Sequence, residues 1–266
     1  MKELRLAKKI IKTLVKDRIQ YPGRLLADTL TTSGRCVVLL LLYYYVFNLK
    51  GGLINNTTFI VAAWSIFFYF AFMNLNLRNI ARLIMADVQS GNIEVLLNKP
   101  ISYLLYRSWW QIGAGLYSFL VVTLLGSVAL ILIIGIPSTM TIALFLPTVF
   151  LTFLMAVVLS LLIYIIVGLL SFWIIDINPV FWLIDKMVMI LGGSYLPVAL
   201  FPNFLYQISI YSPFGASQFI THVVYESWQM NWYWLILVQI FWIIVLGLAV
   251  YFMFRSVKKK VSINGG

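Results

Sequence analysis

The sequence has a single cysteine and a single histidine, Cys36 and His222. One cysteine has no partner for a disulfide within the chain, and no cysteine–histidine cluster is present that would hold a metal ion. Redox chemistry through paired thiols is therefore excluded, and no metal site is predicted. The chain also lacks a Gly-x-x-x-x-Gly-Lys-Ser/Thr loop, so it is not expected to cradle ATP by that device.

Charge is scarce as well. Only 10% of the residues are charged, 62% are hydrophobic, and the mean hydropathy is +0.98. A chain of 266 residues with this composition would expose far too much apolar surface to be soluble. We therefore predict an all-α integral membrane protein in which residues 1–266 form a single transmembrane domain. The first 20 residues do not read as a secretory signal, because Lys and Arg recur throughout them.

The cationic residues are distributed unevenly along the chain. Of the 19 Lys and Arg, 18 lie before the first apolar segment or early in it, between Arg78 and Arg107, at Lys186, or from Arg255 onward. Lys50 is the exception. Cytoplasmic loops collect such residues, so the pattern predicts a multi-pass protein of the cytoplasmic (inner) membrane with both termini in the cytoplasm. Anchoring against anionic membrane lipid accounts for the net charge of +11, and no nucleic-acid partner is expected.

Six stretches are long and apolar enough to cross about 30 Å of hydrocarbon, which takes roughly 20 helical residues. We expect them near residues 28–48, 57–77, 108–135, 140–173, 180–201 and 232–254. Residues 1–22 are predicted to form an amphipathic helix on the inner surface, with Leu4, Ala7, Ile11, Leu14 and Val15 on its apolar face. Whether this helix is a simple anchor or a coupling element stays open.

The first predicted span carries an intramembrane charge. Arg35 falls within the inner half of the bilayer, and Asp28 lies two helical turns earlier on the same face, where it would partly neutralise Arg35. An uncompensated Arg at that depth costs about 2.5 kcal/mol or more. Two interpretations stay open: Arg35 extends to the inner interface, or it has a role in substrate binding or gating.

The longest polar interruption lies between the second and third predicted spans. The second span is expected to continue as a helix to about Asp87, and Ser90-Gly91 then breaks the helix. A short amphipathic helix with Ile93, Leu96 and Leu97 follows and ends before Pro100. Residues 78–101 form this cytoplasmic segment. Its short helix is shaped to dock in a groove of a soluble partner, or else to pack against its own bundle.

Gly192-Gly193, Pro197 and Pro202 interrupt the apolar pattern around the fifth predicted span. Irregular backbone at membrane depth is tolerated where it is buried in protein or lines a cavity, so these four residues are candidates for a gate; close packing of small residues is the alternative. Aromatic residues such as Phe68 are candidates for lining a pathway, or are packing and interfacial residues.

Two other functional classes, intramembrane hydrolases and ion-coupled carriers or channels, agree less well with the sequence. An intramembrane hydrolase would pair a nucleophile with a base at one depth, but Ser217 and His222 are poorly spaced, and His222 is expected at the outer interface. An ion-coupled carrier or a channel usually has ionisable residues near the membrane centre, and apart from Asp28 and Arg35 the predicted spans show none that we place there. This second class is the alternative to the function given below.

Two segments allow a more specific comparison. The run Asp87-Val88-Gln89-Ser90-Gly91-Asn92-Ile93-Glu94-Val95-Leu96-Leu97-Asn98-Lys99-Pro100-Ile101-Ser102 resembles the "SG-x-IE-x-LL-x-(R/K)PIS" segment of bacterial ABC-transporter permeases of the type-2 (ABC-2) exporter superfamily. The later residues Leu191-Gly192-Gly193, Pro197, Leu200-Phe201-Pro202 and Ser212-Pro213-Phe214 look like the fifth span of the same family and the outer segment after it.

The resemblance implies a membrane subunit that pairs with a second membrane subunit, identical or homologous, and with two separate ABC ATPase subunits. ATP and Mg would bind to those partners, so this chain is expected to bind no cofactor and to catalyse no reaction itself. The element between spans two and three would be a coupling helix seated in the ATPase. The turn Asp176-Ile177-Asn178-Pro179 would be a second contact, and residues 202–229 would dip back into the outer leaflet.

Carried onto this chain, the resemblance gives specific ATPase-coupling residues. They are Asp87, Ser90, Gly91, Ile93, Glu94, Leu97, Asp176 and Asn178, with Glu94 and Asp87 as charged contacts and Ile93 and Leu97 as the apolar anchor. The expected function is export of a hydrophobic or amphipathic substrate, such as a lipid-like molecule, peptide or drug, by alternating access.

Overall fold

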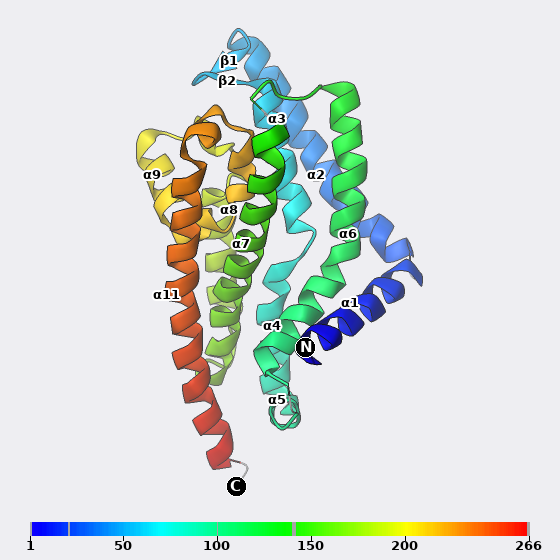
Figure 1. The fold of residues 1–266 in the computed structure, drawn as a ribbon, viewed down its shortest axis with the longest axis vertical. Helices are drawn as coiled ribbons and strands as arrows, with labels where there is room; N and C mark the ends of the chain where they lie inside the picture. The colour runs from blue at the N-terminus through cyan, green and yellow to red at the C-terminus, as the bar shows by residue number, and fades with distance from the viewer. Residues whose placement is uncertain (1, 21, 100, 140–141, 265–266) are drawn as a thin grey trace.

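The computed structural model describes residues 2–20, 22–99, 101–139 and 142–264, and it consists mainly of helices (Figure 1). Five helical segments are long and apolar enough to cross a membrane. They are Leu30–Leu49, Phe59–Gln89, Tyr103–Ile133, Leu146–Phe172 and Glu226–Lys258. At this level the prediction of an all-α, multi-pass membrane fold is confirmed.

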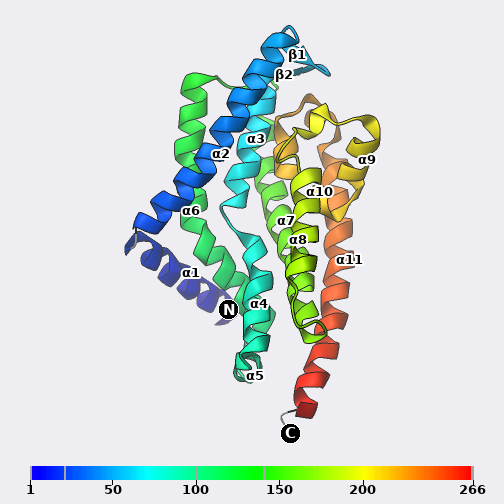
Figure 2. The same ribbon diagram turned by 180° about the vertical axis from the view of Figure 1, so that it is seen from behind.

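The chain runs back and forth between two ends of an elongated bundle (Figures 1 and 2). In order, its elements are α1 (Lys2–Gln20), α2 (Pro22–Leu49), β1 (Leu53–Ile54), β2 (Thr57–Thr58), α3 (Phe59–Met73), η1 (Leu77–Asn79), α4 (Ile80–Gln89), α5 (Asn92–Leu97), α6 (Tyr103–Ile133), α7 (Ile142–Leu169), η2 (Leu170–Phe172), α8 (Asn178–Leu191), η3 (Val198–Leu200), α9 (Asn203–Tyr211), α10 (Pro213–Ala216), η4 (Phe219–Val224) and α11 (Glu226–Asn264).

The two ends differ in what they contain. The antiparallel β1–β2 hairpin lies at one end, here called the hairpin end, whereas α5 and the last turns of α11 lie at the other, here called the basic end (Figure 1). Thr58 closes the hairpin and begins α3, because its side-chain oxygen accepts a hydrogen bond from the Val61 backbone N–H at 3.4 Å.

The second predicted span is not one continuous helix to Asp87. α3 ends at Met73, Asn76 takes a left-handed backbone conformation with φ of 51°, and the helix resumes only at η1 and α4. Asparagine tolerates this conformation better than most residues. The Gln111 side chain of α6 donates a hydrogen bond to the Asn76 carbonyl at 2.9 Å, which satisfies a backbone group released by the break.

The fifth predicted span, residues 180–201, is also not one helix. α8 has only 14 residues and ends at Gly192 and Gly193, the latter with φ of +84°. At 1.5 Å per residue such a helix is about 21 Å long, short of the roughly 30 Å hydrocarbon core. The chain instead reaches the hairpin end through α8 and the short helices η3, α9, α10 and η4 beside α11 (Figure 2). The structure therefore has five membrane-length helices among its described residues where the sequence predicts six.

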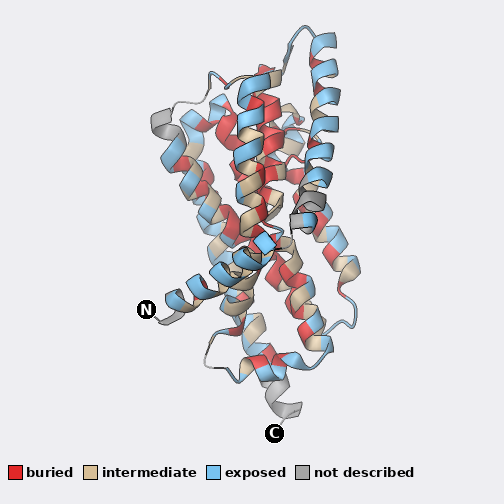
Figure 3. Ribbon diagram, turned by 90° about the vertical axis from the view of Figure 1, so that its right-hand side faces the viewer, coloured by how far each residue is buried: buried red, intermediate tan, exposed pale blue. Residues whose placement is uncertain are grey.

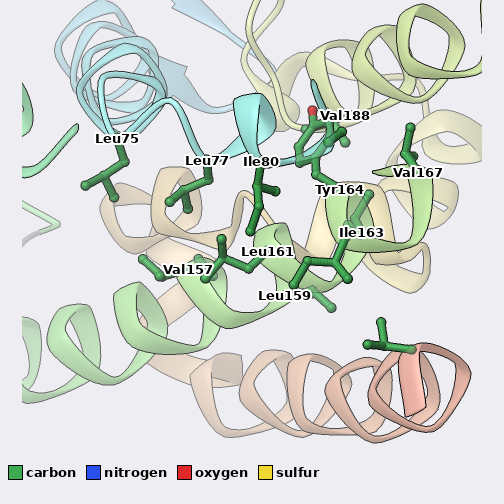
Figure 4. Close-up of a cluster of buried hydrophobic side chains, with 14 of the residues drawn as sticks. Leu75, Leu77, Ile80, Val157, Leu159, Leu161, Ile163, Tyr164, Val167 and Val188 are labelled. Atoms are coloured by element: carbon green, nitrogen blue, oxygen red, sulfur yellow. The ribbon is translucent and has the colours of Figure 1, made fainter. Parts of the chain in front are cut away.

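α7 is the central helix of the bundle. Its side chains Val157, Leu161 and Tyr164 pack against Leu77 and Ile80 of the second span in the largest core cluster (Figure 4). Because lipid tails are as apolar as these side chains, close packing rather than exclusion of water holds the cluster together. Buried residues gather in these central helices (Figure 3), whereas only 17% of the apolar stretches of α2 and α6 is buried.

The predicted amphipathic helix 1–22 is present as α1, and part of its apolar face contacts protein. Ala7 is buried, and Ile11 and Leu14 lie against Gly113 of α6. α1 is therefore joined to the bundle through α6 and is more than a surface anchor. The side chain of Leu4 lies outside the described residues.

Gly115 allows α6 to approach the break in the second span. A Cβ atom at this position would lie 2.2 Å from the Leu75 carbonyl oxygen, a backbone atom that has no freedom to move aside. We expect Gly115→Ala to lower the free energy of unfolding by about 1–3 kcal/mol, as overpacking does. Thermal unfolding of the purified protein in detergent would measure this loss.

Gly247→Ala is the matched control, because Gly247 lies in α11 and a Cβ atom added there would have nothing within 4 Å of it. This change should leave the unfolding temperature unchanged or raise it slightly through better helix propensity. Equal unfolding temperatures for Gly115→Ala and the unchanged protein would contradict the close approach of α6 to the break.

Candidate functional site

The short helix α5 forms a ledge at the basic end. Gly91, with φ of +71°, ends α4 and turns the chain into α5, as the Ser90-Gly91 pair predicts. Ile93 and Leu96 are buried in the main core cluster, whereas Glu94 is exposed and Val95 keeps 61% of its surface exposed. The helix thus packs on its own bundle with one face and leaves the opposite face exposed.

A buried ion pair braces this ledge from behind. The Arg107 guanidinium at the start of α6 donates two hydrogen bonds to the Asp87 carboxylate of α4, one of them from Nε at 2.6 Å. The Tyr103 hydroxyl donates a third at 2.7 Å, and the Tyr103 ring stacks on Phe254 of α11. Asp87 is only 4% exposed. This bidentate pair and the stacked ring fix α4, α6 and α11 to one another directly behind α5.

These contacts change the roles expected for two of the residues. The sequence predicts Asp87 as a charged surface contact and Ile93 as part of an apolar anchor for a partner, but both side chains point into the protein. Leu97 is half-buried against the same core cluster. The Ser90 hydroxyl donates to the Ala86 carbonyl at 2.7 Å and closes α4. Of the predicted contact side chains on α5, Glu94 is the one that the structure leaves exposed.

The second predicted contact lies beside the first. Asp176 is exposed, and its carboxylate accepts hydrogen bonds from the backbone and the side chain of Asn178, which starts α8. Gln89, at the end of α4, donates a hydrogen bond to the Ile175 carbonyl at 3.0 Å. The structure therefore brings the α4–α5 corner and the α7–α8 turn together at the basic end.

A second ion pair, with a buried carboxylate, joins the break in the second span to α8. Arg78 of η1 donates to the Asp185 carboxylate at 3.0 Å, and the Tyr164 hydroxyl of α7 donates to its other oxygen at 2.9 Å. Asp185 is only 2% exposed. The sequence alone does not predict this triad. A carboxylate inside an otherwise apolar span was the available signal, because such a group needs a cationic partner.

Two cavities meet beside this triad. One, of about 450 Å³, lies between α1, α2, α6 and the break; the other, of about 810 Å³, lies between α2, α4 and α8. Thr31, Arg35 and Arg78 line both. Arg35 therefore lines both cavities and is exposed, and both sequence interpretations stay open. The side chain of Asp28 lies outside the described residues.

The four gate candidates divide into buried and exposed positions. Gly192 and Gly193 are buried, and a Cβ atom on Gly192 would lie 2.4 Å from the Gln218 side chain. Pro197 is buried at the start of η3, whereas Pro202 is exposed before α9. The two glycines end α8 and also allow the chain to pack closely. The end of the helix and the small-residue packing therefore fall on the same two residues.

Phe68 lies in an aromatic cluster near the hairpin end. Its ring is half-buried and contacts Trp64 at 5.7 Å and Phe67 at 5.9 Å between centroids. The Trp64 indole N–H donates to the Gly135 carbonyl at 2.9 Å and ties α3 to the end of α6. These contacts favour a packing role for Phe68. A third cavity, of about 770 Å³, opens at the hairpin end between β2, α9 and the start of α11.

His222 is a core residue and not the interface residue that the sequence predicts. It is 2% exposed in η4, and its ring packs edge-on against Phe219 and Tyr225. Burial lowers the pKa of His222 to about 3. The Ser217 hydroxyl donates to the Phe214 carbonyl at 2.7 Å, so the structure does not join it to His222 as a nucleophile and base.

No protein-family model matches this chain, and no curated protein matches it. The resemblance of residues 87–102 to ABC-2 permeases stays a prediction, and function has to be argued from the geometry above.

The Asp87 bracing leads to a test of stability. Asp87→Ala would leave the Arg107 guanidinium buried without its counter-charge, and we expect a loss of about 3–5 kcal/mol in the free energy of unfolding. Tyr103→Phe removes one hydrogen bond and should cost about 1 kcal/mol. Asp176→Asn, at an exposed position, is the control and should cost less than either. Thermal unfolding in detergent measures all three, and an Asp87→Ala protein as stable as the unchanged one would contradict the bracing.

His222 predicts a pH dependence of stability. The folded pKa of about 3 lies below the ordinary value of 6.5, so between these values the unfolded chain binds a proton that the folded chain does not. The free energy of unfolding should therefore fall as the pH drops below 6.5, by about 1.4 kcal/mol per pH unit. His222→Gln should remove this part of the slope when unfolding is followed from pH 7.5 to pH 5. Parallel pH profiles for the two proteins would show that His222 does not contribute.

Proposed function

We propose that this protein is the membrane-spanning permease subunit of an ATP-driven ABC exporter, which moves a hydrophobic or amphipathic substrate across the cytoplasmic membrane by alternating access. In this assembly it pairs with a second membrane subunit and with two ABC ATPase subunits. The braced α5 ledge is the observation that carries the proposal. The resemblance of residues 87–102 to the coupling segment of ABC-2 permeases supports it independently.

The basic end is proposed to face the cytoplasm. α1 lies in the half of the bundle that ends in α5 and the last turns of α11 (Figure 1), and α1 together with these last turns carries most of the Lys and Arg residues, which fits the preference of cytoplasmic loops for cations. α8 together with the turn after it would make the sixth crossing, so that both termini lie on one side. Residues 202–229, with α9, α10 and η4, would form the re-entrant outer segment at the hairpin end.

The ATPase is proposed to grip the exposed face of α5. Glu94 supplies a charge, and the adjacent Val95 supplies an exposed apolar contact, a combination typical of helices that dock in grooves. The turn at Asp176 and Asn178 lies next to this face and would be the second contact. Asp87 and Ile93 then act from behind, because they hold α5 rigidly on the bundle.

The same contacts give a route for movement. A force on α5 is passed to α4 and, through the Asp87–Arg107 pair, to α6, and α4 begins at the break in the second span. There Arg78 joins this segment to Asp185 of α8, so displacement of α5 would reposition the walls of the two cavities at the break. Short helices and ion pairs with discrete arrangements are the usual parts of such transitions.

The Arg78–Asp185–Tyr164 triad favours one alternative, an ion-coupled carrier that needs no ATPase. Buried ionisable residues inside a helical bundle are typical of proton and ion pathways. Vesicles that contain only this chain distinguish the two functions. Transport driven by a pH gradient and abolished by Asp185→Asn would support the carrier, whereas transport that requires the ATPase and ATP would support the permease.

The role of α5 can be tested with a double change on its exposed face. Glu94→Lys with Val95→Asp should reduce co-purification of an ABC ATPase co-expressed with this chain by about tenfold or more, because it reverses the charge of Glu94 and removes the apolar contact of Val95. Transport should fall in parallel, while thermal stability should stay close to that of the unchanged protein.

Asp17→Asn, which makes the same net change of one charge unit at an exposed position of α1, is the control and should co-purify normally. The docking role is wrong if the double variant binds the ATPase and transports as the unchanged protein does.

A further inference from the structure

The two cavities at the break carry an unusual excess of cationic groups. Arg18, Arg35 and Arg78 line the smaller one, together with polar side chains of Asn74, Asn76, Asn79, Gln111 and Ser118. No Asp or Glu is among the described residues that line this cavity. Arg78 is already paired with Asp185, whereas Arg35 has no carboxylate within ion-pair distance among the described residues and would attract an anion.

The larger cavity adds an apolar wall to this charge. Arg35, Arg78, Arg82 and Lys186 line it, and Asp185 is the one carboxylate among its described lining residues. Both Asp185 oxygens already accept hydrogen bonds, from Arg78 and from Tyr164. The cationic groups of this wall therefore outnumber the acidic ones. The apolar part of the lining comprises Leu30, Val38, Leu39, Phe70, Phe181, Trp182, Met189 and Tyr195.

Aromatic rings hold two of these cations in position. The Arg82 guanidinium lies 4.4 Å from the centroid of Phe181, and the Lys186 ammonium lies 5.2 Å from that of Trp182. A ring beneath a guanidinium leaves its in-plane N–H donors available. Arg82 is thus oriented by an apolar contact while its hydrogen-bonding edge stays open to a ligand.

Arg35 is the cation at which the two cavities meet. It lies one and a half turns into the membrane-length part of α2, and among the described residues no carboxylate is within ion-pair distance of it. An arginine at this depth is costly unless an anion joins it. The forked donors of a guanidinium bind carboxylates and phosphates alike, but a phosphate monoester carries about two negative charges and three terminal oxygens and can therefore engage several guanidinium groups at once.

We propose that the two neighbouring cavities bind an amphiphile whose head group is a net-anionic phosphate, such as a phosphate monoester, taken from the membrane leaflet at the basic end. The head group lies between Arg35, Arg78 and Arg82, and the tail lies along the apolar wall made by α2 and α8. The volumes fall in the range of small-molecule sites. As a statement about the transported substrate, this inference rests on the proposed function; as a statement about binding, it does not.

The cavity at the hairpin end has the opposite electrostatic character. Glu226 is the one charged residue among its described lining residues, beside polar and aromatic side chains such as Tyr206 and Asn203. A phosphate that moved from the cationic cavities toward this one would lose its attraction and meet a carboxylate. An anionic head group is therefore expected to bind more weakly at the hairpin end than at the basic end.

Binding can be measured on the purified full chain in nanodiscs of neutral lipid, without ATP. The probes are lysophosphatidic acid, lysophosphatidylcholine with the same acyl chain, and glycerol 3-phosphate, which has the head group but no tail. We expect lysophosphatidic acid to bind at least about tenfold more tightly than either of the other two. Equal binding of the two lipids would overturn the role of the cations, and equal binding of glycerol 3-phosphate would overturn the role of the apolar wall.

Arg35→Gln tests the site without breaking a described ion pair. It should weaken lysophosphatidic acid binding about tenfold or more, whereas Arg255→Gln, the same loss of charge at an exposed position of α11, should change it less than about twofold. Equal effects of the two changes would show attraction by the surface as a whole and would overturn the site.

Failure of this inference and failure of the proposed function are separate results. If the α5 variant loses the ATPase but the unchanged protein shows no preference for lysophosphatidic acid, the permease function stands and the proposed substrate class is wrong. If the protein binds lysophosphatidic acid specifically but no ABC ATPase drives its transport, the binding site stands and the exporter function is wrong.

Discussion

The fold depends on how the bundle accommodates the break in its second membrane-length segment. Backbone groups released from a helix inside an apolar bundle have no water to bond with, so protein side chains have to satisfy them. Gln111 of α6 donates to the Asn76 carbonyl, and Gly115 lets the same helix approach Leu75. Specific contacts from α6 therefore stabilise the unwound turn at the break.

The break also decides where charge can be buried. By turning the chain, it places Arg78 beside Asp185 of α8, whose other oxygen is within reach of the Tyr164 hydroxyl of α7. Breaking a pair that holds a buried charge is far more costly than breaking one at the surface, because the remaining charge is left in an apolar environment. The Asp87–Arg107 pair follows the same logic at the basic end. Together these two ion pairs divide the bundle into rigid parts that meet at the break in the second span.

The proposed function and the proposed site both use this division. Asp87 fixes α4 to Arg107 of α6, and the larger cavity lies where α4 meets α2 and α8. A movement of the ledge would therefore be felt first at Arg35, Arg78 and Arg82. Mechanical coupling and substrate binding then share one structural element, which is the arrangement that alternating access requires.

The sequence by itself determined the class of fold and the ends of several elements. Apolar run length predicts membrane helices, because the thickness of the bilayer sets a minimum, and Gly91 predicts the end of α4, because few other residues accept its backbone conformation. These signals are local. The same local reasoning also identified Arg35 as a residue in need of an explanation.

Tertiary structure decided what the side chains do. Nothing in the run 87–102 shows that Asp87 and Ile93 point inward while Glu94 points outward, since that depends on Arg107 and on the core contributed by α7. The pairing of Arg78 with Asp185 joins residues 107 positions apart. The burial of His222 likewise depends on the packing of η4 against α3 and α7. Burial and ion pairing are properties of the assembled bundle, because each depends on which surfaces come together, and a single sequence records only the residues that are available for them.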